Sequence, residues 1–81
     1  MKNMGFGVLG MIDVELRMMA AGKMTSTVSL EEGSTCSVLL DRSGIDRKRT
    51  LVVLLNGRYA EPDRELRHGD VVSVFPPVAG G

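Results

Sequence analysis

Two stretches near the start of the chain alternate between apolar and polar residues, the two-residue period of a strand with one buried face. In the first, residues 12–18, Ile, Val, Leu and Met alternate with charged residues. In the second, residues 25–30, Ser26, Val28 and Leu30 alternate with Thr and Ser, and its Thr and Val residues favour strands. Because only a short segment, residues 20–23, separates the two stretches, we expect an antiparallel hairpin.

A short amphipathic helix is predicted next. Ser34 or Thr35 can cap it by accepting hydrogen bonds from the exposed backbone N–H groups of its first turn. Apolar residues then recur at helical spacing: Cys36, Leu39 and Leu40. Gly44 suits the left-handed position after a helix, and Ile45 can pack back on the last turn, as in a Schellman ending. The pattern predicts about two to three turns.

The second half of the chain predicts strands joined by turns. Residues 51–55 are a continuous apolar run, typical of a strand covered on both faces or of one that keeps a face for a partner. Asn56-Gly57 is a turn signal, residues 58–60 suggest a brief return strand, and residues 71–75 a final strand. With the helix as a right-handed crossover, the order predicts an α+β fold: a mixed sheet of about four to five strands with one helix on one face.

Composition narrows the possible functions. The chain has 81 residues, enough for one domain, and ten basic and ten acidic residues give a net charge of zero. This balance argues against a nucleic-acid binder held by a broad positive field. We interpret Arg47-Lys48-Arg49 as a solvated loop. The single cysteine, Cys36, excludes an internal disulfide and is expected to be a small buried hydrophobe. His68 has no nearby Ser or Cys signature, so a hydrolytic triad is not predicted.

The start of the chain is predicted to lie outside the folded domain. The apolar stretch from Met4 to Ile12 is far shorter than the roughly 20 residues that span a bilayer. Charged residues follow it at once, and no signal-peptide cleavage site fits. We therefore expect residues 1–10 to form a loose leader, the domain to comprise residues 11–75, and the protein to be cytoplasmic without a membrane partner.

The end of the chain carries the candidate chemistry. Each of Pro76 and Pro77 fixes φ near −65°, and Phe75 is pushed toward an extended conformation. Residues 76–81 should therefore form a stiff extended tail that spans about 20 Å at most. Gly80 and Gly81 lack a Cβ, so the terminal carboxyl carbon is unshielded. The alternative is an ordinary frayed terminus.

Three features together resemble the MoaD/ThiS family of sulfur carriers, which are ubiquitin-like β-grasp proteins: the element order, Leu66-x-x-Gly69-Asp70-x-Val72, and the ending Phe75-Pro-Pro-Val-Ala-Gly-Gly. The resemblance implies that an adenylyltransferase akin to ubiquitin-activating enzymes, using ATP and magnesium, activates the carboxylate of Gly81. Sulfur from a donor protein then gives a thiocarboxylate, with Gly80 providing clearance. The chain would thus be a protein cosubstrate that binds no cofactor or metal itself, rather than an enzyme.

The resemblance also assigns partner contacts. The tail, Pro76, Pro77, Val78 and Ala79, would insert into the large subunit of molybdopterin synthase. Phe75 would pack against the partner, although it could instead complete the core. Arg58, Arg64 and Arg67 could meet an acidic partner rim or simply be solvated.

Several functions stay open from the sequence. The tail resembles the small subunit of molybdopterin synthase, whereas the tight first hairpin and the short segment after the helix resemble the thiamine-pathway carrier, whose partner is a thiazole synthase. The same Gly-Gly ending would serve a ubiquitin-like modifier joined to lysines of target proteins. A β-grasp interaction domain with an incidental Gly-Gly ending is the remaining alternative, because a fold alone does not define a function.

Overall fold

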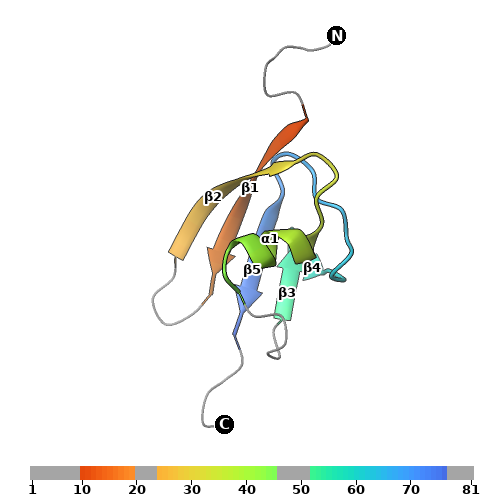
Figure 1. Ribbon diagram of the computed structural model, residues 1–81. Helices are drawn as coiled ribbons and strands as arrows, with labels where there is room; N and C mark the ends of the chain where they lie inside the picture. Colours follow the sequence, from red (N-terminus) through yellow and green to blue (C-terminus); the bar gives the residue numbers. More distant parts are fainter. Residues whose placement is uncertain (1–9, 20–23, 46–51, 77–81) are drawn as a thin grey trace.

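The computed structural model describes residues 10–19, 24–45 and 52–76. Its elements are β1 (Met11–Met18), β2 (Met24–Glu31), α1 (Cys36–Arg42), β3 (Val52–Leu55), β4 (Arg58–Tyr59) and β5 (Val71–Phe75). They follow the predicted order (Figure 1). Within the described ranges, a five-stranded mixed sheet and a single helix confirm the α+β class.

The first and last strands of the chain lie side by side at the centre of the sheet, whose order is β2-β1-β5-β3-β4. β1 and β5 are parallel, and the other neighbouring pairs are antiparallel. Parallel neighbours require a crossover, and the segment that contains α1 provides it. The predicted first hairpin is confirmed, because β1 and β2 pair along their full length, from Met11 opposite Glu31 to Met18 opposite Met24.

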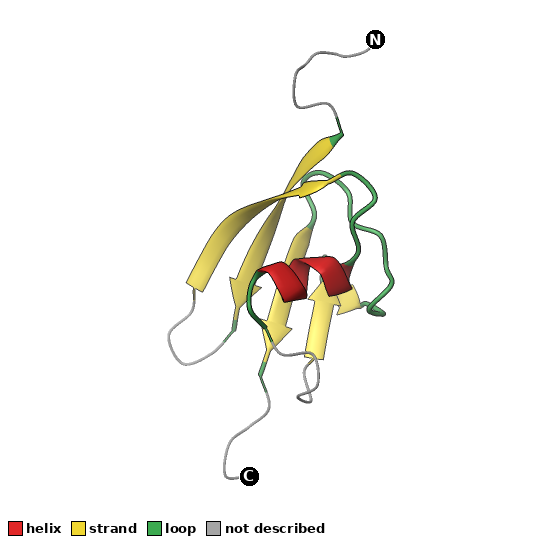
Figure 2. Ribbon diagram, in the orientation of Figure 1, coloured by secondary structure: helices red, strands yellow, loops and turns green. Residues whose placement is uncertain are grey.

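Helix α1 covers one face of the sheet (Figure 2). Alternate residues of β1 point toward it and are buried, whereas Asp13 and Arg17 between them are exposed, as the alternation predicted. The buried core is aliphatic apart from one cysteine: Ile12, Val14, Leu16, Leu30, Cys36, Leu39, Leu40, Leu55, Leu66, Val72 and Val74. Its members come from β1, β2, α1, β3, β5 and the loop before β5, so the core joins the whole described domain.

Both ends of α1 have the predicted caps. Thr35 is the N-cap, and its Oγ1 accepts a hydrogen bond of 3.3 Å from the backbone N–H of Val38. At the other end Gly44 has φ +74°, in the left-handed region. The N–H of Ile45 donates to the carbonyl of Leu40 at 2.9 Å, and Ile45 packs against the core. This is the Schellman ending expected from the sequence.

The strands of the second half differ from the prediction in their details. Leu51, predicted to start the third strand, lies outside the described residues, as do residues 1–9 and Arg47-Lys48-Arg49. β3 is not covered on both faces, since Val52 is 38% exposed. β4 ends at Tyr59, one residue earlier than expected, and the N–H of Ala60 donates to the carbonyl of Val53.

Candidate functional site at the base of the tail

The last strand is held on both sides up to the point where the tail begins. The N–H of Met19 donates to the carbonyl of Val74 at 2.8 Å, which extends the pairing with β1. On the other side Phe75 lies opposite Val52 of β3. Pro76, which follows, is exposed. The tail therefore starts from a fixed position at the end of a central strand of the sheet.

The rest of the predicted tail lies outside the described residues: Pro77, Val78, Ala79, Gly80 and Gly81. Their predicted roles stay predictions. The structure describes Phe75 and Pro76, from which the tail starts, and the protein surface around them.

Phe75 lies on the face of the sheet that α1 does not cover, which we call the open face. Its neighbours in β5, Val72 and Val74, are fully buried toward the helix, and successive side chains of a strand point to opposite faces. Phe75 is half-buried and belongs to neither the buried core nor the residues packed against it. The ring therefore does not complete the core, which leaves it available for the predicted partner contact.

The open face has an apolar half beside the tail. Residues directly opposite each other in neighbouring strands share a face, so the register shows which side chains join Phe75. They are Val71 and Ser73 of β5, Val52 and Leu54 of β3, and Tyr59 of β4, of which Ser73 alone has a small polar side chain. Tyr59 is 83% exposed, and Val52 is also exposed. An exposed apolar patch of this kind is typical of a protein-binding surface.

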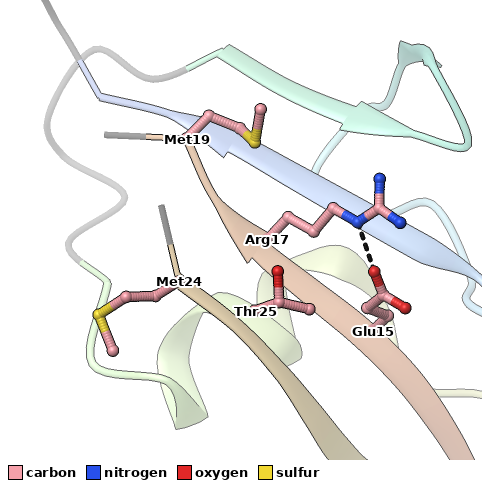
Figure 3. Close-up of a pocket in the computed structure, with 5 residues that line it drawn as sticks. All are labelled: Glu15, Arg17, Met19, Met24 and Thr25. Carbon is pink, nitrogen blue, oxygen red and sulfur yellow. Dashed lines mark hydrogen bonds and ion pairs between the residues drawn. The ribbon is translucent and has the colours of Figure 1, made fainter. Parts of the chain in front are cut away.

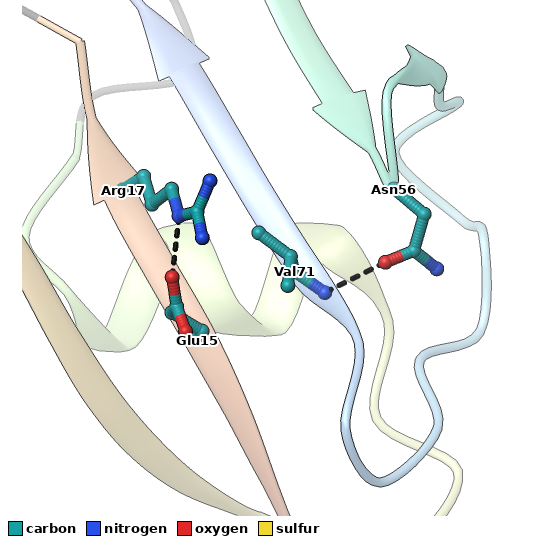
Figure 4. A network of polar contacts seen from close by, with 4 residues as sticks. All are labelled: Glu15, Arg17, Asn56 and Val71. Carbon is teal, nitrogen blue, oxygen red and sulfur yellow. Dashed lines mark hydrogen bonds and ion pairs between the residues drawn. The ribbon is translucent and has the colours of Figure 1, made fainter.

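The other half of the open face is polar. On β1, the Arg17 guanidinium forms an ion pair with the Glu15 carboxylate (Figure 4). Next to this pair is a shallow pocket of about 240 Å³, lined also by Met19, Met24 and Thr25 (Figure 3). Since the N–H of Met19 bonds to β5, the pocket lies close to the base of the tail. A partner on the open face would thus meet an apolar half, an ion pair and the shallow pocket beside that pair.

The side chain of Asn56, whose sequence pattern predicted only a turn, fixes the start of β5. Asn56 has φ +51°, and its Oδ1 accepts a hydrogen bond of 2.9 Å from the N–H of Val71 (Figure 4). Its Nδ2 donates to Asp70 at 3.0 Å. Asp70 also accepts from the N–H of Arg67, and Gly69 has φ +89°, so this turn has a structural role. The Asn-Gly signal marked the turn but not its link to the last strand.

Three titratable residues of the described domain, Cys36, His68 and Glu31, make packing, hydrogen-bond or ion-pair contacts within the fold. Burial raises the pKa of the Cys36 thiol, which is 1% exposed and packs in the core as predicted. A thiol with a raised pKa is a poor nucleophile. The Nδ1 atom of His68 accepts a hydrogen bond from the N–H of Asp13, which ties the turn before β5 to β1. A backbone hydrogen bond, and then Arg42, lower the pKa of the exposed Glu31.

The three arginines that could meet an acidic partner rim are exposed, and they lie far from the base of the tail. Arg64 and Arg67 lie in the loop that leads into β5, and Arg58 is in β4. They line two adjacent shallow pockets at the start of β5, of about 360 and 240 Å³. Phe75 is at the other end of the strand, about 13 Å away at the usual rise per residue. The structure thus separates these arginines from the tail.

Two further properties concern the described residues alone. Their His, Cys, Asp and Glu side chains form no group of three or more that could hold a metal ion. Within the same ranges, no helix has the length and hydropathy that crossing a bilayer requires.

The described elements define a ubiquitin-like β-grasp protein whose last strand ends beside an open sheet face. Residues 15–81 match the ThiS family, so the chain belongs to that family. Among curated proteins, none matches the sequence. Proteins of the MoaD/ThiS type are small sulfur carriers that are not enzymes themselves and work with an activating enzyme and a synthase partner.

Solved structures show the same fold. A protein assigned as molybdopterin converting factor, subunit 1, from Pyrococcus furiosus is 29% identical, with a TM-score of 0.69 over 83% of this chain and 99% of that one. SAMP1 from Haloferax volcanii is 26% identical, with a TM-score of 0.70 over 85% of this chain and 99% of that one. Ubiquitin from Caldiarchaeum subterraneum, at 12% identity and a TM-score of 0.66 over 89% of this chain and 100% of that one, shares the fold alone.

Proposed function

We propose that this protein carries sulfur on the C-terminal carboxyl group of Gly81 for molybdopterin synthesis. The observation that carries the proposal is the base of the tail: β5 is paired with β1 up to Val74 and with β3 up to Phe75, and the sequence continues directly into Pro76 and the Gly-Gly ending. The similarity to the molybdopterin converting factor subunit favours this pathway. Sulfur carriage for thiamine is the second candidate, supported by the match to the ThiS family.

The chemistry follows from the weak reactivity of a carboxylate. In the proposed sequence a carboxylate oxygen of Gly81 attacks the α-phosphorus of ATP on the activating enzyme, and pyrophosphate leaves. The resulting acyl adenylate has a good leaving group. A sulfide equivalent from the sulfur donor protein attacks the acyl carbon, and AMP departs with the electron pair of the broken C–O bond. The product is a thiocarboxylate, which can donate its sulfur to the cofactor precursor.

The chain contributes position and access to these steps. The sheet fixes the start of the tail, the two prolines limit its conformations, and Gly80 leaves room around the acyl carbon. Positioning of this kind lowers the entropy cost of bringing a carboxylate into a deep site. The apolar half of the open face, which includes Phe75, would dock on the activating enzyme and on the large synthase subunit, while the tail enters the partner. We place the whole exchange in the cytoplasm.

Intact-mass measurement after coexpression with a matching activating enzyme and sulfur donor tests the shared chemistry. We expect a mass increase equal to the exchange of one oxygen atom for sulfur, abolished by deletion of Gly81. A variant with one extra alanine after Gly81 is the matched control, because it retains the whole domain but moves the carboxyl group. An unchanged mass with an active activating enzyme would refute sulfur carriage.

Genetic rescue separates the pathways. Restoration of molybdoenzyme activity in a strain without the small subunit of molybdopterin synthase supports the proposal. Rescue only of a strain without the thiamine carrier would transfer the function to thiazole synthesis. Amide-linked conjugates in extracts, with no thiocarboxylate, would instead indicate a ubiquitin-like modifier.

A further inference from the structure

The two edges of the sheet differ sharply in how they are protected. β4 forms one edge with only two residues, Arg58 and Tyr59, and is too short to template another strand. β2 forms the other edge with eight residues, and from Met24 to Leu30 it contains neither a charged residue nor a proline. Natural sheets usually guard a long edge with such residues. β2 therefore has the properties of a pairing site.

The hydrogen-bond pattern shows which backbone groups face this edge. Antiparallel pairs alternate between residues that exchange hydrogen bonds and residues that do not. The N–H of Glu32 donates to the carbonyl of Gly10, and the register places these two residues opposite each other. Because hydrogen-bonded pairs recur at every second residue, the backbone groups of the even-numbered residues of β2 form the hydrogen bonds to β1. The N–H and carbonyl groups of Thr25, Thr27 and Ser29 thus point to the free edge, where the described residues include no further strand.

We propose that β2 pairs with β2 of a second copy of this chain, antiparallel and about a two-fold axis at Thr27. In this arrangement Thr27 lies opposite itself, and Thr25 lies opposite Ser29 of the second copy, so only hydroxyl side chains meet on the open face. Thr–Thr and Thr–Ser cross-strand pairs are favourable, and the arrangement brings no like charges together. A closed two-fold contact of this kind uses the same surface in both copies.

The helix side of the edge fits the same register. Met24, which is 69% exposed, would lie opposite Leu30 of the second copy, a fully buried core residue. Ser26 would lie opposite Val28, which is half-buried. The contact would therefore cover the exposed Met24 at the rim of the neighbouring core. A pairing of one strand edge is small, so we expect a weak dimer with a dissociation constant in the range of about 10 μM to 1 mM.

The dimer would leave the apolar half of the open face free in both copies, whereas Met24 and Thr25, which line the pocket beside Glu15 and Arg17, would lie at the contact. Five strand spacings separate the two copies of β5, or about 24 Å. Because β1 is parallel to β5 and antiparallel to β2, the two β5 strands run in opposite directions and the two tails leave at opposite ends. Both open faces lie on the same side of a continuous ten-stranded sheet. The proposal thus does not depend on the chemistry of the tail.

Sedimentation equilibrium on the full chain, from about 10 μM to 1 mM, tests the contact. Thr27→Lys is the disrupting variant, because it sets two ammonium groups side by side at the axis. Thr27→Val is its matched control, since Val keeps the strand preference without a charge. We expect the wild type and Thr27→Val to dimerise, and Thr27→Lys to bind itself about tenfold or more weakly. Urea unfolding shows whether both variants keep the stability of the monomer.

Amide hydrogen exchange supplies a second, position-specific readout. Dimerisation should slow exchange at Thr25, Thr27 and Ser29 as concentration rises, and Thr27→Lys should abolish that slowing. A wild-type chain that stays monomeric up to about 1 mM would overturn the proposal. So would a Thr27→Lys variant that is folded and dimerises like the wild type. Protection of these amides that requires another added protein would assign the edge to a foreign strand instead and equally overturn it.

Discussion

Two neighbouring residues at the end of β5 give the sharpest test of the open face. Val74 is fully buried toward α1, whereas Phe75 is half-buried on the opposite face and outside the core. If Phe75 is a surface group, truncating its large ring must cost less stability than truncating the smaller side chain of Val74. The prediction therefore reverses the order that side-chain size alone would suggest.

The magnitudes follow from burial. Val74→Ala removes two buried carbons, each worth about 0.8 kcal/mol, and leaves a cavity, so we expect a loss of about 2–3 kcal/mol in the free energy of unfolding. Full burial of a Phe side chain is worth about 1.5–3 kcal/mol. Phe75 is half-buried and has roughly half of that to lose, so Phe75→Ala should cost about 1 kcal/mol.

Urea unfolding of the two variants measures this difference. With a slope near 1 kcal/mol per molar urea, the midpoint should fall by about 2 M for Val74→Ala and by about 1 M for Phe75→Ala. Under conditions in which both variants are folded, the proposed docking role predicts that only Phe75→Ala lowers the rate of loading by the activating enzyme. A stability loss for Phe75→Ala as large as that for Val74→Ala would refute the placement of the ring. Normal loading of the folded Phe75→Ala variant would refute its docking role.

Three further predictions concern the scaffold. Thr35→Ala removes the oxygen that caps Val38 N–H and should cost about 1 kcal/mol in urea unfolding, whereas Thr35→Ser should cost clearly less. The pKa of Cys36 is raised in the folded chain, so the unfolded chain loses its thiol proton first as pH rises past 9.0. The stability of the wild type relative to Cys36→Ala should then fall above that pH, and a difference that stays constant would contradict the burial argument. Asn56→Ala should cost about 2 kcal/mol, because it loses the bond to Val71 and strains a left-handed residue. Asn56→Gly keeps that conformation and should cost less, so equal losses would show that strain plays no part.

Much of the fold was predictable because its signals are local. The alternation in β1 identified its buried face correctly, and Thr35 and Gly44 marked the ends of α1 to within a residue. Caps and turns depend on backbone groups a few residues away, so the sequence specifies them directly. The match to a sulfur-carrier family likewise confirmed the resemblance drawn from the tail and the element order.

The alternation of the first two strands, the ends of the helix and the residue types of the tail could be recognised in the sequence. Which face of β3 stays uncovered, on which side of the sheet Phe75 lies, and that Asn56 binds the start of β5 became clear only from the folded arrangement. The reason is that a sequence pattern shows only which residues of one strand share a face. Which of the two faces is buried depends on how that strand pairs and packs with segments that are distant in sequence. β5 shows this most clearly: its apolar run has two possible inner faces, and its position between β1 and β3 beneath α1 selects one.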